Sequence, residues 1–143
     1  MNEKLNRFLE AQEKDYAIAL EEIRKGRKQG HWMWYIFPQI QGLGHSSTSK
    51  YYAIQNIEEA TEYLNHLILG TRLIEICNEL LKLDNNDAYS IFGSPDHRKL
   101  KSSITLFLQV ENANPVFKAV IEKFFDGKPD YRTIEKLENI SAK

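Results

Sequence analysis

Hydrophobic residues recur at steps of three and four near the start of the chain, which indicates an amphipathic helix. We expect this helix to span about residues 4–25, because the basic pair Arg24–Lys25 and then Gly26 form a usual helix ending. Gln12 interrupts the apolar stripe, so its amide should either tie down neighbouring backbone or contact a ligand. The apolar stripe consists of Leu5, Phe8, Leu9, Tyr16, Ala19, Leu20 and Ile23.

Residues 26–50 show no helical period, and this segment reads as a long loop. A loop of more than twenty residues usually has a functional or packing role. The segment contains both tryptophans of the chain, so we expect it to pack into the domain instead of serving as a polar linker. The residues that interrupt regular secondary structure in this segment are Gly26, Gly30, Pro38, Gly42 and Gly44.

Helical signals return and continue over residues 56–139. Asn56 is a typical helix cap, with Glu59 at the third helical position. Proline favours the first position of a helix, and the pairs Ser94-Pro95 and Asn114-Pro115 therefore predict two further helix starts. We therefore predict one all-α domain over residues 1–143 with about six to seven helices and a packed aromatic loop after the first. The helices expected in this body start near residues 57, 66, 88, 95, 115 and 131.

The charge balance changes the set of possible partners. Nineteen Lys and Arg residues against twenty Asp and Glu give a net charge of −1, which argues against DNA or RNA binding. No apolar run approaches the ~18 residues of a membrane span, and we expect no signal peptide, because the start Met1-Asn2-Glu3-Lys4 lacks the basic-then-apolar pattern of one. The lone Cys77 lies on an apolar helix face and predicts a core residue in a reducing cytoplasm. We expect no metal and no cofactor, since neither a metal-ligand spacing nor a Gly-x-Gly-x-x-Gly turn is present.

The most distinctive segment is residues 31–39, here called the aromatic block. Trp32, Trp34 and Phe37 offer flat faces on which a planar ring can stack. An imidazole can take up or release a proton near neutral pH, which makes His31 a candidate for proton transfer, and Lys28 could meet a phosphate group. The alternative is that the tryptophans are core residues and that His31 only satisfies a backbone carbonyl.

Two further segments could complete a site. Gly42, Gly44 and Ser46 can form a nest of backbone N–H groups for an anion, although the segment lacks the ending of a Walker loop. Asp96, Lys99 and Ser103 share one face of the expected helix over residues 95–110. That face is either a pocket wall or a solvated surface with one ion pair.

The order of these motifs resembles a bacterial and fungal domain family of unknown function, number eighteen-ten in domain catalogues. The resemblance covers nearly the whole chain. Members sometimes carry the label "calpastatin", but nothing in this sequence supports a protease inhibitor. The matching motifs are Gly26-Arg27-Lys28, the block from His31 to Gln39, Gly42-Leu43-Gly44, Tyr51-Tyr52-Ala53-Ile54, Leu69-Gly70-x-Arg72-Leu73, Asp96-x-x-Lys99-Leu100 and the run from Ser102 to Phe107.

The resemblance implies a mainly helical, YbiA-like fold, because the family is remotely similar to the YbiA/NADAR superfamily. Members of that superfamily hydrolyse N-glycosidic bonds in ribose-containing compounds. The YbiA-type glutamate is missing from the look-alike segment at Ser49–Tyr52, so proton transfer would fall to Asp96, Lys99 or His31.

The leading hypothesis is a pocket for ADP-ribose or a related nucleoside phosphate, with N-glycosidase activity as its reaction class. The alternatives are a non-catalytic nucleotide-sensing module, or a protein-interaction module whose aromatic loop is only core. The predicted ligand-binding residues are Gln12, Lys28, Trp32, Trp34, Phe37, Gln39, Gly42, Gly44, Ser46, Tyr52, Arg72 and Ser103.

Overall fold

The computed structural model describes residues 3–142, and this part of the chain forms nine α-helices, one 3-10 turn and no strand. The all-α prediction is confirmed, but the expected number of helices is too low. The two additional helices, α2 and α3, are short and lie in or at the end of the segment expected to be a loop. The elements are η1 (Glu3–Leu5), α1 (Asn6–Arg24), α2 (Met33–Ile36), α3 (Ser47–Tyr52), α4 (Ile57–Asn65), α5 (Leu67–Lys82), α6 (Ala88–Phe92), α7 (Asp96–Leu108), α8 (Pro115–Phe125) and α9 (Tyr131–Ser141).

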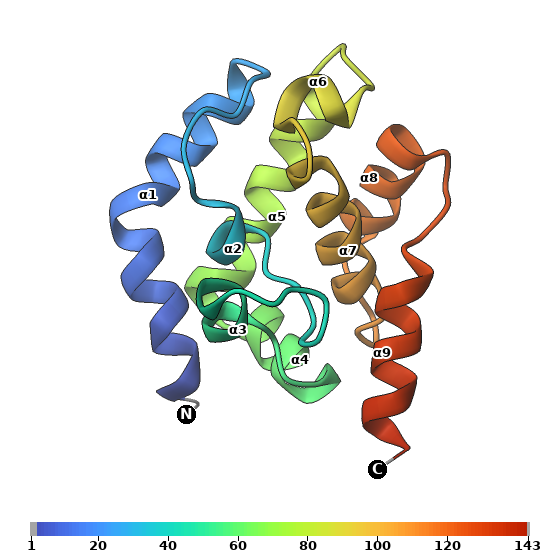
Figure 1. Ribbon diagram of the computed structural model, residues 1–143. Helices are drawn as coiled ribbons and strands as arrows, with labels where there is room; N and C mark the ends of the chain where they lie inside the picture. The colour runs from blue at the N-terminus through green and yellow to red at the C-terminus, as the bar shows by residue number, and fades with distance from the viewer. Residues whose placement is uncertain (1–2, 143) are drawn as a thin grey trace.

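Helix α5 runs through the middle of the bundle and contacts α1, α4 and α8 (Figure 1). Helix α7 packs against α4, α6, α8 and α9, so the second half of the chain closes around it. Gly70 on α5 lets the end of α4 approach closely, because a Cβ atom there would lie 2.0 Å from the carbonyl oxygen of Leu64. Helix α1 starts and α9 ends at the same end of the molecule (Figure 1).

The segment between α1 and α4 is packed against the bundle, as its aromatic content predicts. Met33, Ile36, Phe37 and Ile40 are all buried in the core. Gly26 adopts a positive φ of 77° directly after α1, which confirms the glycine-terminated helix ending. This segment therefore forms part of the domain, and it supplies one face of the molecule over α2 and α3.

Cys77 is fully buried on α5, and burial raises the pKa of its thiol well above the ordinary value. Such a thiol stays protonated, which fits the predicted core role. Among residues 3–142, no helix is both long and apolar enough to cross a bilayer. That part of the chain also contains no cluster of three or more His, Cys, Asp or Glu side chains able to hold a metal ion.

Candidate functional site

A pocket of about 380 Å³ opens between the aromatic block and the segment around α3. This volume lies within the range of small-molecule sites. Five of the predicted ligand residues line it, which brings the aromatic block and the glycine segment together. The lining comprises Trp34, Gln39, Ile40, Gln41, Gly42, Gly44, His45, Ser49, Lys50, Tyr52, Ala53 and Gln55.

A short parallel backbone pairing holds the pocket floor. The amide of Ile54 donates to the Gln39 carbonyl at 2.8 Å, and the amide of Gln41 donates to the Ile54 carbonyl at 2.9 Å. The side chains of Ile40 and Ile54 are buried beneath it. This pairing joins the two segments that carry the pocket residues, so their relative position is fixed by backbone hydrogen bonds.

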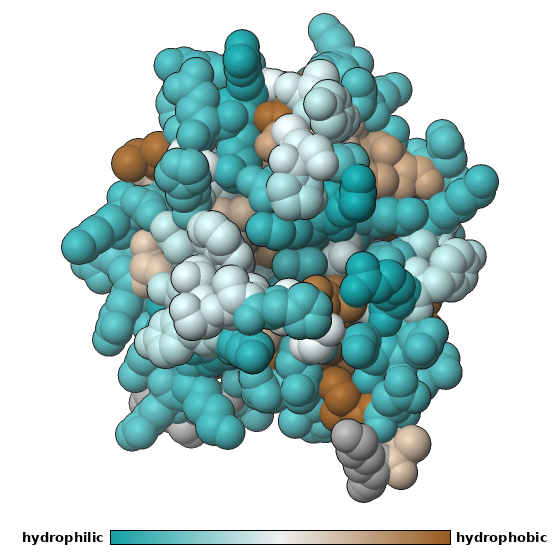
Figure 2. All heavy atoms as spheres, viewed as in Figure 1, coloured by the Kyte–Doolittle hydropathy of each residue, from teal (hydrophilic) through white to brown (hydrophobic). Residues whose placement is uncertain are grey.

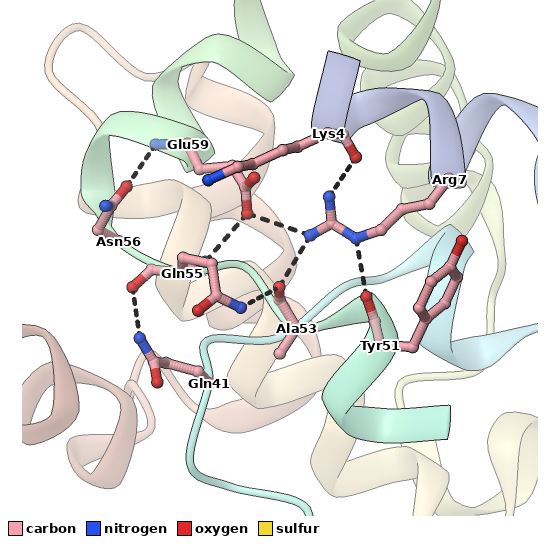
Figure 3. A network of polar contacts seen from close by, with 8 residues as sticks. All are labelled: Lys4, Arg7, Gln41, Tyr51, Ala53, Gln55, Asn56 and Glu59. Atoms are coloured by element: carbon pink, nitrogen blue, oxygen red, sulfur yellow. Dashed lines mark hydrogen bonds and ion pairs between the residues drawn. The ribbon is translucent and has the colours of Figure 1, made fainter. Parts of the chain in front are cut away.

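Arg7 of α1 anchors the segment that follows α3 (Figure 3). Its guanidinium donates to the Tyr51 carbonyl at 2.8 Å and to the Ala53 carbonyl at 2.9 Å. The same group forms an ion pair with Glu59 at 3.1 Å, and the Glu59 carboxylate also accepts from the Gln55 amide at 3.0 Å. This arrangement, which we call the Arg7–Glu59 latch, ties one pocket wall to α1 and α4.

The aromatic walls of the pocket are the half-buried rings of Trp34 and Tyr52. The Tyr52 ring packs against Tyr35, with 5.1 Å between ring centroids, and against Phe8 at 6.0 Å. Burial, followed by the nearby Tyr51 phenol and carboxylates, raises the pKa of Tyr52, so this side chain is a neutral hydrogen-bonding phenol at neutral pH. On the face shown in Figure 2, side chains of intermediate hydropathy gather over α2 and α3 within a mostly hydrophilic surface.

The polar lining of the pocket carries the ammonium of Lys50 and the side-chain amides of Gln39, Gln41 and Gln55, and none of the lining residues is acidic. Lys50 and His45 are exposed at its rim. Within residues 3–142, Lys50 forms no ion pair, and the side-chain amide of Gln39 has no hydrogen-bond partner. These groups are therefore available to a ligand, and their charge favours an anion.

A second polar group, here called the charged cluster, consists of Lys28, Asp96 and Lys99. The Asp96 carboxylate lies 2.8 Å from Lys28 Nζ and 3.4 Å from Lys99 Nζ. Only 7% of the Lys28 side chain is exposed, and its ammonium also donates to the Gly30 carbonyl. The Lys99 ammonium lies 4.7 Å from the centroid of the Trp34 ring, so the cluster borders the pocket through that ring.

The cluster continues inward to Trp32, whose side chain is 1% exposed. The Trp32 ring nitrogen donates to the Glu22 carboxylate at 2.9 Å, and the amides of Gln29 and Gly30 donate to the same oxygen. Burial alone would raise the pKa of Glu22, but these hydrogen bonds and the nearby Lys28 lower it overall. Trp32 is thus a core residue with a satisfied ring N–H.

Other predicted ligand residues lie outside the pocket. The Gln12 amide is buried and donates to the Tyr35 carbonyl at 2.7 Å and to the Tyr63 hydroxyl at 3.0 Å. Arg72 donates to the Gln12 side-chain oxygen at 3.3 Å. Gln12 therefore ties down neighbouring backbone, which is one of the two roles expected for it, and Arg72 has a partner inside the protein; neither of these two predicted ligand residues lines the pocket.

The remaining predicted residues have separate environments. Phe37 is fully buried, His31 is exposed at the start of the aromatic block, and Ser46 caps α3 by accepting from the Ser49 amide at 3.1 Å. Ser103 is fully buried on α7, and its hydroxyl is the one buried side-chain polar atom without a partner in residues 3–142. None of these four lines the pocket.

Sequence reasoning missed several residues that build the site. Arg7 and Glu59 carry the latch, yet only the helix-capping position of Glu59 left a signal in the sequence. Gln41 and Gln55 line the pocket; the Gln41 side-chain amide donates to the Gln55 backbone carbonyl at 2.8 Å, and the Gln55 side-chain amide donates to the Ala53 carbonyl at 3.1 Å. Polar residues in an unpatterned segment carry no periodic signal, so only their three-dimensional positions reveal them.

Comparisons with known proteins agree with this fold. The chain is similar to the crystal structure of the conserved hypothetical protein Rv1873 from Mycobacterium tuberculosis, with 44% sequence identity and a TM-score of 0.91 over 94% of this chain and 96% of that chain. No curated protein matches the chain. The YbiA/NADAR link finds no support in these matches and stays a prediction. A family model described as "Protein of unknown function (DUF1810)" matches residues 2–137, and the chain belongs to this family.

Proposed function

We propose that the pocket between the aromatic block and α3 binds a nucleoside phosphate of the ADP-ribose type. The observation that carries this proposal is that two aromatic rings, the unpaired side-chain amide of Gln39 and the ammonium of Lys50 line a single cavity of about 380 Å³. A nucleoside phosphate combines a planar base with a charged phosphate, and the pocket offers a complement to each part.

Trp34 and Tyr52 are the residues to which we assign the base. Aromatic stacking tolerates different bases, since every base has a π-face. To the unpaired side-chain amide of Gln39 we assign recognition of a polar edge of the stacked ring, because an amide supplies both a donor and an acceptor. Base preference would therefore depend on Gln39, while affinity would depend on the rings.

Lys50 and His45 are the residues to which we assign charge recognition at the rim. A phosphate neutralises a lysine ammonium with a charge-assisted hydrogen bond, which is stronger than a neutral one. The absence of any acidic side chain from the pocket lining leaves such an anion without a repelling neighbour.

Calorimetric titration with ADP-ribose, NAD and GMP tests this proposal. We expect binding of at least one ligand, and we expect Trp34→Ala to weaken it about ten- to hundredfold through loss of base stacking. Tyr89→Ala is the matched control, because Tyr89 is 59% exposed on α6 outside the pocket. Absence of heat with all three ligands from the folded protein, or equal effects of the two substitutions, would contradict the proposal.

An N-glycosidase is the second candidate function, and the position of Lys99 favours it. Lys99 contacts the Trp34 ring while it pairs with Asp96, so a carboxylate and an ammonium lie behind the proposed base site. We infer that Asp96 or Lys99 would act at the ribose carbon if the ligand is turned over. Asp96 holds two lysines and does not line the pocket, which makes binding the better supported of the two functions.

Release of nicotinamide from NAD, followed by chromatography, tests this second candidate. Asp96→Asn and Lys99→Met should each abolish release, while Lys118→Gln, at an exposed position on α8, should retain it. Release that survives both cluster substitutions would remove the proposed catalytic pair.

A further inference from the structure

A second hollow of about 420 Å³ adjoins the pocket on the side of α9. Gln41 and Gly42 line both cavities, so the two form a continuous surface across the turn at residues 42–44, here called the glycine turn. The residues that line this second hollow are Gln41, Gly42, Lys136, Asn139 and Ile140.

Lys136 of α9 lies directly over the glycine turn. A Cβ atom at Gly42 would be 3.3 Å from Cε and 3.4 Å from Nζ of Lys136, so the end of the lysine side chain lies in close contact with the glycine backbone. Gly42 also has a positive φ of 92°, which other residues rarely adopt. Lys136 forms no ion pair or hydrogen bond within residues 3–142, and its charge is therefore uncompensated.

The backbone of the glycine turn adds donors beside this charge. The N–H groups of Gly42 and Gly44 have no acceptor in the part of the chain that the structure describes. Free backbone N–H groups in a turn that contains a positive-φ residue, here Gly42, are suited to an anion. No acidic residue lines the hollow.

Hydrogen bonds at the start of α9 fix the helix that carries Lys136. The Asp130 carboxylate accepts from Ser102 at 2.8 Å and from Thr133 at 2.6 Å. The Asp130 amide donates to the Thr105 hydroxyl at 2.9 Å. Helix α7 thereby sets the position of α9, and Lys136 follows Thr133 by one turn.

We propose that Lys136 and the glycine turn form an anion subsite that holds the second phosphate of a nucleoside diphosphate whose base lies at Trp34. This inference rests on the proposed function and deepens it, because it assigns the second phosphate of the pyrophosphate group to Lys136 and the glycine turn. In this arrangement, with the base at Trp34, the phosphate of a monophosphate contacts Lys50 at the pocket rim. The second phosphate of a pyrophosphate group extends past Gly42 and contacts Lys136.

Calorimetry with adenosine, AMP, ADP and inorganic pyrophosphate tests the subsite. We expect ADP to bind more tightly than AMP, and Lys136→Gln to weaken ADP binding about five- to tenfold through loss of one charge-assisted contact. Binding of adenosine should be unchanged. Lys136→Arg should retain ADP affinity because it keeps the charge, and Lys118→Gln is the matched control for loss of an exposed lysine.

The outcomes separate the subsite from the pocket. The subsite would be overturned if Lys136→Gln left the affinity for ADP unchanged, or if it lowered the affinities for adenosine and ADP equally. In either case, adenosine binding that is lost in Trp34→Ala would still support the pocket. Pyrophosphate binding that requires Lys136, without any binding of adenosine or AMP, would support the subsite and overturn the nucleoside pocket. A circular dichroism melt of each variant confirms that the fold is intact.

Discussion

The surroundings of Trp32 and Trp34 are the most instructive comparison in the molecule. Trp32 is 1% exposed, and its ring packs against Phe37 and Phe92 with centroid distances of 6.2 and 6.4 Å. Trp34 is half-buried, with its ring in the pocket wall beside Lys99. Two identical side chains, two positions apart, thus belong to the core and to the candidate site.

The short helix α2 explains this difference. Trp32 caps the helix and Trp34 is its second residue, and two residues correspond to about 200° of rotation around a helix axis. The two rings therefore leave the backbone on nearly opposite sides. A helix of one turn is therefore sufficient to direct one ring of an aromatic segment into the core and another into the wall of the candidate pocket.

The largest expected effect is a difference in stability between Trp32→Ala and Trp34→Ala. Trp32→Ala should lower the free energy of unfolding by about 3–5 kcal/mol, because it leaves a large cavity in the core. Trp34→Ala should lower it by less than about 1 kcal/mol, since that ring is already partly solvated. Urea denaturation followed by circular dichroism measures both values, and equal losses would end the distinction between the two rings.

The charged cluster that joins the two tryptophans gives the next largest effect. Asp96→Asn should lower the free energy of unfolding by about 1–3 kcal/mol, because it removes the ion-pair partner of the nearly buried Lys28 ammonium. Adding Lys28→Met should recover part of that loss, since the double variant no longer buries an unpaired charge. Urea denaturation followed by circular dichroism measures both variants. An Asp96→Asn variant as stable as the wild type would show that burial of the Lys28 ammonium does not depend on its ion pair with Asp96.

A smaller, pH-dependent effect should follow from Glu22→Gln on the Trp32 side. The pKa of Glu22 in the folded protein lies below its ordinary value of 4.5, so the ionised carboxylate stabilises the folded state above that pH. This contribution is lost as the pH falls through the folded pKa. The variant should therefore be less stable than the wild type at neutral pH, and the difference should shrink in acid. A constant difference between pH 7 and pH 3 would contradict this role.

The smallest expected effect belongs to the cation on the Trp34 side. Lys99→Met should cost about 0.5–1 kcal/mol of stability through loss of the cation–π contact and a partly exposed ion pair. The emission of Trp34 should change, because the ammonium lies 4.7 Å from its ring centroid. Fluorescence of Lys99→Met in a Trp32→Phe background reports on Trp34 alone. An unchanged emission spectrum would show that the Lys99 ammonium does not contact the Trp34 ring in solution.

Local signals in the sequence predicted the helical body well. Caps at Asn56 and Asn114 accept from the amides of Glu59 and Val116 as expected, and the helix ending at Gly26 has the positive φ that glycine permits. These features are decided by residues within a few positions of one another. The one-turn helix α2 was not predicted, because four residues are too few to display a period.

The candidate site was predicted only in part. The aromatic block and the glycine segment do meet at one pocket, but Gln12 and Trp32 belong to the interior instead. Which face of a tryptophan meets solvent depends on the neighbours packed around it. Those neighbours come from distant parts of the chain, and their positions leave no mark in the local pattern.

The sequence alone therefore determined the helical class, the approximate helix ends and the segment that carries the candidate site, because hydrophobic periodicity and capping chemistry are local. Only the tertiary structure decided that Trp34 lines a pocket while Trp32 is core, that Arg7 latches the pocket wall 44 positions away at Tyr51, and that Lys136 of the last helix lies over Gly42. These pairings arise when the helices pack, since packing selects the side chains that face one another across the bundle.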